Sequence, residues 1–271
     1  MSAGARPSAG GIAHTQVKLG HGALAVARAG AGQAVVLLHQ TPRSWDEYRD
    51  VLPLLAAAGC QAIALDTPGF GESAPVPGRP SIEAWAGAAN AALDALGIGR
   101  AAVVGHHTGG AIAVELASQR SDRVAALVLS STALTDAAYR AAPPDESGVD
   151  EAQDADGLRR SRAGFYPPDR PDLLDRYVAD ALRAGSLARL GHHVVGAYAM
   201  DGKLAALEMP VLLIGADRDP YAYPQLERMR RALPRAEVAV IDGGMVPLPD
   251  GRPEEFAELI AGFLARIGFL A

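Results

Sequence analysis

The sequence predicts an α/β protein with a mostly parallel, twisted sheet, helices on both faces of that sheet and an inserted helical cap. Short apolar runs alternate with helix-like segments over residues 34–130, which is typical of a parallel sheet covered on both faces. The alternation stops over residues 136–205, where charged residues and proline are frequent and no clear strand pattern occurs. It resumes at residue 210, so a chain of 271 residues fits one large domain with an insertion.

The composition limits the classes of function. Hydrophobic residues make up 49% of the chain, which allows a substantial core, and aromatic residues only 5%, too few for a nucleic-acid stacking surface. The net charge of −6, without a basic run, argues against nucleic acid and membranes as partners. The single cysteine, Cys60, excludes an internal disulfide. We expect a small-molecule or peptide substrate and a monomer or homodimer.

The first residues are rich in Gly, Ala and Ser and lack the basic start and apolar stretch of a signal peptide. Residues 1–14 are therefore expected to form a disordered tail. No stretch approaches the length of a membrane span. We expect a cytoplasmic protein.

The first half of the chain contains the signals of most of the strands. Alternating residues flank Gly20-His21-Gly22, which predicts a hairpin. The predicted strands in this half lie at residues 15–19, 23–28, 34–38, 61–65, 101–104 and 125–130. Helices are predicted from Ser44 and from Ser81, since serine is a preferred helix-capping residue. A third is predicted over the alanine-rich segment that Gly109 and Gly110 open and that ends at about Ser118.

The second half begins with the predicted cap, residues 136–205, which we place over the carboxyl edge of the sheet. It contains helix-like segments at 173–184 and 187–200 and a linker around Pro143-Pro144-Asp145-Glu146. Strands and helices then alternate at residues 210–215, 226–233, 237–241 and 253–267. Residues 15–135 and 206–271 are assigned to the core.

The segment Gly105-His106-His107-Thr108-Gly109-Gly110 has the spacing of a strand, a tight turn and a helix, the layout of a nucleophile elbow. Its glycines allow the strand and the helix to approach each other closely. The central residue, His107, is expected at the strained apex of the turn. Histidine tolerates a positive φ better than most residues. Without a hydroxyl or thiol at this apex, no acyl-enzyme forms in the ordinary way.

Five motifs in order make the sequence resemble the α/β-hydrolase fold superfamily from about residue 15 to 270. They are His39-Gln40-Thr41-Pro42, Asp66-x-x-Gly69-x-Gly71-x-Ser73, the Gly105–Gly110 elbow, Gly215-x-Asp217-x-Asp219 and Pro253-Glu254-Glu255-Phe256. The resemblance implies an oxyanion hole made by the backbone amides of Thr41 and Thr108. It places residues 136–205 in the position of the family's cap.

Three departures from the family pattern separate this sequence from an ordinary member. Gln40 stands where the family has glycine, His107 stands where it has the nucleophile, and Met245 stands where it has the general-base histidine. The sequence is therefore interpreted as an atypical member without the Ser and His of the triad. In this loss it resembles the epimerase type of bottromycin biosynthesis.

The acid position of the family falls beside Asp217 and Asp219, and we favour Asp219 because it precedes Pro220. Since Met245 leaves room, the longer His107 side chain could reach Asp219 and form a dyad, with the carboxylate fixing the imidazole tautomer. Such a base beneath an oxyanion hole suits removal of a proton next to a carbonyl. The alternative is that His107 only fills the pocket.

The motif positions also suggest residues that bind substrate. These are His39, Gln40, Trp45, Phe70, Met245 and His193. His192 and His193 are adjacent on a predicted helix and diverge by about 100°, so at most one faces the cleft. No histidine spacing supports a metal site, and no cofactor is predicted.

Three functions remain open at this stage. The first is non-hydrolytic carbonyl chemistry of the epimerase, isomerase or lyase type. The second is an atypical hydrolase that activates water directly, and the third is a non-catalytic ligand-binding protein on the same fold.

Overall fold

The computed structural model describes residues 11–20, 22–142 and 154–270. Its centre is a sheet with the strand order β1-β2-β4-β3-β5-β6-β7-β8, parallel from β4 to β8 and antiparallel at β1 and β2. The strands are β1 (Ala13–Leu19), β2 (Gly22–Ala29), β3 (Gln33–Leu38), β4 (Cys60–Leu65), β5 (Ala101–His106), β6 (Val124–Ser130), β7 (Val211–Ala216) and β8 (Glu237–Ile241). The predicted α/β class with a mostly parallel sheet is confirmed.

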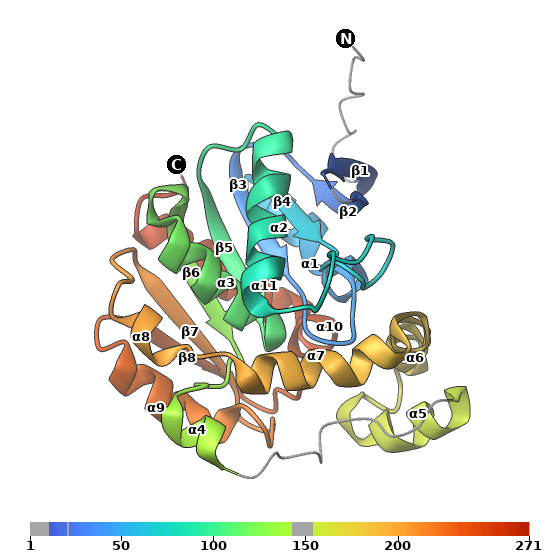
Figure 1. Cartoon of the computed structure of the whole chain (residues 1–271). Helices are drawn as coiled ribbons and strands as arrows, with labels where there is room; N and C mark the ends of the chain where they lie inside the picture. Colours follow the sequence, from blue (N-terminus) through green and yellow to red (C-terminus); the bar gives the residue numbers. More distant parts are fainter. Residues whose placement is uncertain (1–10, 21, 143–153, 271) are drawn as a thin grey trace.

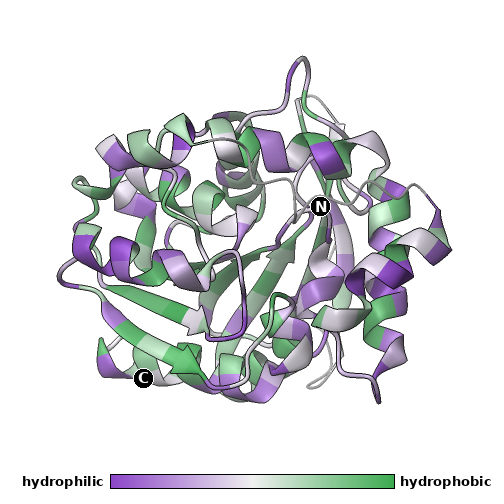
Figure 2. Cartoon of the chain, turned by 90° about the horizontal axis from the view of Figure 1, so that it is seen from below, coloured by the Kyte–Doolittle hydropathy of each residue, from purple (hydrophilic) through white to green (hydrophobic). Residues whose placement is uncertain are grey.

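Helices cover both faces of this sheet (Figure 1). One face carries α2 (Ile82–Ala95), α3 (Thr108–Gln119) and α9 (Tyr223–Ala232), and the other carries α1 (Val51–Ala57), α10 (Leu248–Gly251) and α11 (Pro253–Arg266). Successive strand residues point to opposite faces, so Val36 packs in the first core and Val35 in the second. Burial on both faces explains why the central strands read as continuous apolar runs, which Figure 2 shows as a green centre.

The cap consists of short helices at the carboxyl ends of the parallel strands (Figure 1). They are α4 (Ala137–Ala141), α5 (Ala155–Arg162), the 3-10 turn η3 (Ala163–Phe165), α6 (Pro171–Ala184), α7 (Ser186–Ala197) and α8 (Asp201–Leu204). A small core of its own, including Leu158, Leu173 and Tyr177, holds α5 against α6. The predicted helix at 187–200 ends earlier because Tyr198 is extended, with φ −72° and ψ 129°.

Some predicted boundaries differ from the structure or fall outside it. Strand β1 begins at Ala13, and both Ala13 and His14 pair with β2, so these two residues belong to the sheet and not to the tail. The predicted linker Pro143-Pro144-Asp145-Glu146 and His21 of the predicted hairpin turn lie outside the described residues. None of the described helices has the length and apolar character that a membrane crossing needs.

Buried ion pairs fix the cap to the core. The Arg43 side chain is fully buried; its Nε lies 3.0 Å from Asp180 Oδ2 on α6, and its Nη1 pairs with Asp250 on α10. Arg176 of α6 lies 2.6 Å from Asp46 Oδ2 and 3.2 Å from Asp250 Oδ1. Because the cap helix and the core share these charges, α6 is held in a fixed position at the mouth of the site described below.

Candidate active site

His107 occupies the apex of the turn between β5 and α3, with φ 47° and ψ −111°. This backbone conformation is uncommon for a residue other than glycine and is found most often where a side chain is held for function. A Cβ on Gly109 would overlap the Leu38 carbonyl oxygen, and a Cβ on Gly105 would overlap the Gly109 backbone. Gly105 therefore lets β5 approach α3 closely enough to form the turn, and Gly109 lets the start of α3 approach the end of β3.

The His107 ring points toward Asp219, which follows β7. Its Nε2 lies 2.8 Å from Asp219 Oδ2, and the Asp219 side chain is fully buried. The backbone amides of Tyr221 and Ala222 donate to Asp219 Oδ1 at 2.9 and 3.0 Å. Burial alone would raise the pKa of Asp219, but His107 and these amides outweigh it and lower the pKa to about 2. Asp219 is therefore an anion at neutral pH.

The two ring nitrogens of His107 have different surroundings. Nε2 faces the carboxylate at ion-pair distance, although the ring N–H is not aligned for a hydrogen bond. Nδ1 bonds to no group in the described part of the chain, and the side chain is 18% exposed where it lines a cavity. Asp219 thus favours the tautomer with the proton on Nε2, which leaves Nδ1 as the basic nitrogen.

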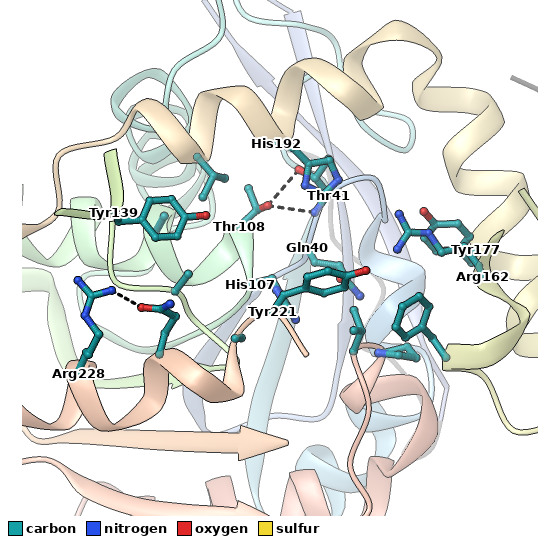
Figure 3. Close-up of a pocket in the computed structure, with 18 of the residues that line it drawn as sticks. Gln40, Thr41, His107, Thr108, Tyr139, Arg162, Tyr177, His192, Tyr221 and Arg228 are labelled. Carbon is teal, nitrogen blue, oxygen red and sulfur yellow. Dashed lines mark hydrogen bonds between the residues drawn. The ribbon is translucent and has the colours of Figure 1, made fainter. Parts of the chain in front are cut away.

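The two predicted oxyanion-hole residues, Thr41 and Thr108, lie side by side beneath the cap. The Thr41 amide donates to Thr108 Oγ1 at 3.3 Å, and the two hydroxyl oxygens are 3.1 Å apart (Figure 3). Thr108 is the first residue of α3, where backbone N–H groups lack an acceptor within the helix. The Thr108 amide is thus unengaged within its helix, whereas the Thr41 amide already has an acceptor.

Gln40 lines the cavity, but its side-chain and backbone amides both donate hydrogen bonds to Glu47. Its Nε2 donates to Glu47 Oε1 at 2.6 Å, and its backbone amide donates to Glu47 Oε2 at 3.0 Å. Burial raises the pKa of Glu47 to about 7. Gln40 therefore anchors the loop after β3.

His39 and His106 are buried, and each is held by two hydrogen bonds. His39 Nε2 accepts from the Thr67 amide and Nδ1 donates to the Gln40 carbonyl, both at 2.8 Å. Burial lowers the pKa of His39 to about 4 and that of His106 to about 3, so both are neutral at neutral pH. His39, predicted to bind substrate, does not line the cavity: its two hydrogen bonds fix the loops around the site.

A cavity of about 590 Å³ lies between the elbow and the cap (Figure 3). Its walls combine aromatic and basic side chains with the elbow residues. The aromatic and basic lining residues are Tyr139, Arg162, Phe165, Tyr166, Tyr177, His192, Tyr221 and Arg228. Apart from His192, which was one of a pair expected to place at most one ring in the cleft, none of these was predicted from the sequence, because the cap residues among them carry no motif and only the folded cap brings them over His107.

Two predicted substrate-binding aromatics lie elsewhere. Trp45 packs against His14, with ring centroids 4.5 Å apart, and does not line the cavity. Phe70 is 1% exposed and packs edge-on between His39 and Trp85. Neither side chain lines the cavity over His107, because Trp45 packs at the sheet edge beside β1 and Phe70 packs against α2.

Met245 and His193 also lie outside the cavity over His107. Met245 lines a neighbouring cavity with Arg218 and Arg252, while the next residues, Val246 and Pro247, reach the cavity over His107. On α7, His193 is exposed and His192 lines the cavity. One histidine of the pair does face the cleft, but the helix phase selects the other one.

Of the two candidate acids, Asp219 forms the contact with His107, and no such contact joins Asp217 to His107 in the described part of the chain. Among residues 11–20, 22–142 and 154–270, no group of three or more His, Cys, Asp or Glu side chains is arranged to hold a metal ion. The structure thus brings together His107, Asp219, Thr41, Thr108 and Gln40 of the predicted site.

A strand, an elbow and a helix around a buried acid define a member of the α/β-hydrolase superfamily. The model of the alpha/beta hydrolase fold family matches residues 33–190, and the chain belongs to this family. It is 26% identical, over 91% of its length and 93% of the relative's, to a 2-hydroxy-6-oxononadienedioate/2-hydroxy-6-oxononatrienedioate hydrolase from a Pseudomonas species. Epoxide hydrolase 2 of Siraitia grosvenorii is 38% identical over 43% of this chain and 38% of the relative.

Solved structures resemble this fold over nearly the whole chain. A meta-cleavage product hydrolase from Pseudomonas fluorescens IP01 superposes with a TM-score of 0.80 at 20% identity, covering 93% of this chain and 98% of the other. The enol-lactonase from Burkholderia xenovorans LB400 superposes with a TM-score of 0.78 at 18% identity, covering 93% and 100%. At these identities the likeness establishes the fold alone.

Proposed function

We propose that this protein is an α/β-hydrolase-fold enzyme that removes a proton next to the carbonyl group of a small organic or peptide substrate, with His107 as the base. The observation that carries the proposal is the 2.8 Å approach of His107 Nε2 to the buried Asp219 carboxylate at the elbow apex. No serine or cysteine stands at this apex. The reaction would therefore pass through an enolate and not an acyl-enzyme.

The proposed step uses the two nitrogens of His107 differently. Nδ1 takes the proton from the carbon, the electrons of the broken C–H bond form a carbon–carbon double bond, and the carbonyl oxygen gains the negative charge. The Asp219 anion stabilises the imidazolium that results. Return of this proton from the imidazolium to a different carbon gives an isomer and regenerates the neutral base. Protonation of the same carbon by water from the other face gives an epimer, and the resulting hydroxide takes the proton from the imidazolium.

The cavity supports a substrate with a small or flat body. A volume of about 590 Å³ is in the range of small-molecule sites, and tyrosine and phenylalanine rings form much of its wall. Arg162 lies over the rings of Phe165 and Tyr177, at 5.6 and 5.4 Å from their centroids. Its guanidinium group is held in place by these stacking contacts on the cavity wall.

A second candidate is a hydrolase in which His107 activates water. The similarity to the Pseudomonas hydrolase over 91% of the chain favours it, since that relative's name describes hydrolysis. In this candidate Nδ1 takes a proton from water, and the hydroxide attacks the substrate carbonyl directly. The bond to the leaving group then breaks, and the imidazolium gives the proton to that group.

Deuterium exchange tests the proposal. Carbonyl compounds and short peptides are incubated with the enzyme in deuterated water and followed by mass spectrometry and proton NMR, with generic esters alongside. We expect deuterium at the carbon next to the carbonyl with the wild type and with His193→Ala, whose side chain is exposed, and none with His107→Ala. Exchange that survives His107→Ala contradicts the proposal. Ester cleavage without exchange supports the second candidate.

A further inference from the structure

We infer that His192, on cap helix α7, is a hydrogen-bond donor to the substrate oxygen and stabilises the negative charge that forms there. This inference rests on the proposed function and names the group that completes it. Three observations carry it: the engaged amide of Thr41, the contact between α7 and Thr41, and the position of His192 on the cavity wall.

Of the two backbone amides expected to bind the substrate oxygen, those of Thr41 and Thr108, only one is available in the core. The Thr41 amide donates to Thr108 Oγ1 at 3.3 Å, so it is not available in this arrangement. The Thr108 amide at the start of α3 is left as a backbone donor. An enolate oxygen held by a single backbone donor is poorly stabilised, since such sites rely on several preorganised donors.

The cap brings α7 directly onto this position. A Cβ on Gly191 would lie 2.8 Å from both Oγ1 and Cγ2 of Thr41, so the missing side chain is what lets α7 pack against the loop after β3. The same approach places the next residue, His192, at the corner of the cavity. Figure 3 shows its ring beside Thr41 and on the cap side of the cavity, with His107 on the core side.

The chemistry of imidazole suits this place. A neutral histidine carries one N–H in either tautomer, and a protonated one carries two, so His192 has a donor in every state. A base from the core and a donor from the cap would then act on the same carbonyl group: His107 takes the carbon-bound proton while His192 binds the oxygen. Removal of one donor of this kind typically lowers the rate by about 100- to 1,000-fold.

A phenolate probe tests the inference without the unknown substrate. p-Nitrophenolate carries its charge on an oxygen attached to a flat ring, and its absorbance separates it from the neutral phenol. We expect the wild type to bind the phenolate in preference to the phenol, and His192→Ala to bind it at least about tenfold more weakly. His192→Gln, which keeps an N–H donor, should bind more tightly than His192→Ala. His193→Ala, on the exposed neighbour, should bind as the wild type does.

Comparison between variants isolates the contribution of His192, because Arg162 and Arg228 line the same cavity in every variant. Circular dichroism and thermal unfolding confirm that each variant is folded. Equal phenolate binding by His192→Ala and the wild type, or no preference of the wild type for the phenolate, overturns the inference. The probe loses no carbon-bound proton, so failed deuterium exchange with intact phenolate binding overturns the proposed function alone.

Discussion

His107 and Asp219 are 112 positions apart in the chain, and the fold places Nε2 of the first 2.8 Å from Oδ2 of the second. The histidine is at the apex of a strained turn, and the acid is fixed by two backbone amides. A side chain held at both ends in this way has little freedom to rotate. The contact therefore gives the imidazole a defined tautomer, and the predictions about catalysis below depend on it.

Asp219→Asn should lower activity about 100-fold or more while leaving the protein folded. The amide can offer its NH2 group to Nε2 of His107, which favours the tautomer with the proton on Nδ1 and removes the base. Asp217→Asn is the control, because within the described residues the ion pair of His107 is made with Asp219 and not with Asp217. The rate of deuterium exchange measures both. Equal losses in the two variants would contradict the dyad.

A histidine placed at position 246 should restore esterase activity more readily than a histidine placed at position 245, when serine replaces His107. Restoration needs a serine at the elbow and a histidine that reaches both it and Asp219. Val246 lines the cavity over His107, whereas Met245 lines the neighbouring one. His107→Ser with Val246→His should therefore cleave p-nitrophenyl acetate faster than His107→Ser with Met245→His. The reverse order would show that Met245 reaches the site.

The sequence was sufficient to predict the fold and the elbow, because both depend on local patterns. Apolar runs between helices indicate buried parallel strands, and the glycine spacing from Gly105 to Gly110 reports a backbone approach that only glycine permits. Asp219 could be chosen over Asp217 from the proline that follows it. These signals come from residues that are adjacent in the chain, so a single sequence is enough to detect them.

The cavity wall could not be predicted, because it depends on how the cap packs. Neither Trp45 nor Phe70 lines the cavity, because Trp45 packs against His14 of β1 and Phe70 packs against Trp85 of α2. The choice between His192 and His193 depends on the rotation of α7, which the contact between Gly191 and Thr41 sets. Such contacts join segments far apart in sequence and leave no local signal.

Ionisation of the buried Glu47 carboxyl should lower the free energy of unfolding as the pH rises from about 5 to 7. Burial raises the pKa of Glu47 from 4.5 to about 7 in the folded state, so between these values the folded protein holds a proton that the unfolded chain has lost. The contribution to the free energy of unfolding is therefore complete below pH 4.5 and is lost toward pH 7. Linkage puts this loss at about 2 kcal/mol between pH 5 and pH 7.

Urea unfolding at pH 5 and pH 7 measures this contribution. In Glu47→Gln the change in unfolding free energy between the two pH values should shift by about 2 kcal/mol relative to the wild type, toward greater stability at pH 7. The variant also loses an acceptor for Gln40, so its absolute stability falls, and only the difference between the pH values is diagnostic. Glu83→Gln, on the exposed side of α2, is the control. An unchanged pH dependence in Glu47→Gln would contradict the assignment.

Asp250→Asn should destabilise the protein by roughly 3 kcal/mol or more, because it leaves Arg43 without its fully buried partner. Arg43 is itself fully buried, and its remaining contacts are with Asp180 on the cap helix α6 and with Asp46. Loss of the Arg43–Asp250 ion pair should loosen the packing of α6 over the site as well as lower the unfolding free energy.

Asp172→Asn is the matched control, since Asp172 pairs with Arg170 in solvent and its replacement should leave stability nearly unchanged. Urea unfolding gives the stabilities, and hydrogen exchange of α6 amides reports the cap. Faster exchange on α6 in Asp250→Asn alone would show that the buried ion pairs hold the cap over His107, whereas equal exchange in both variants would mean that apolar packing holds it.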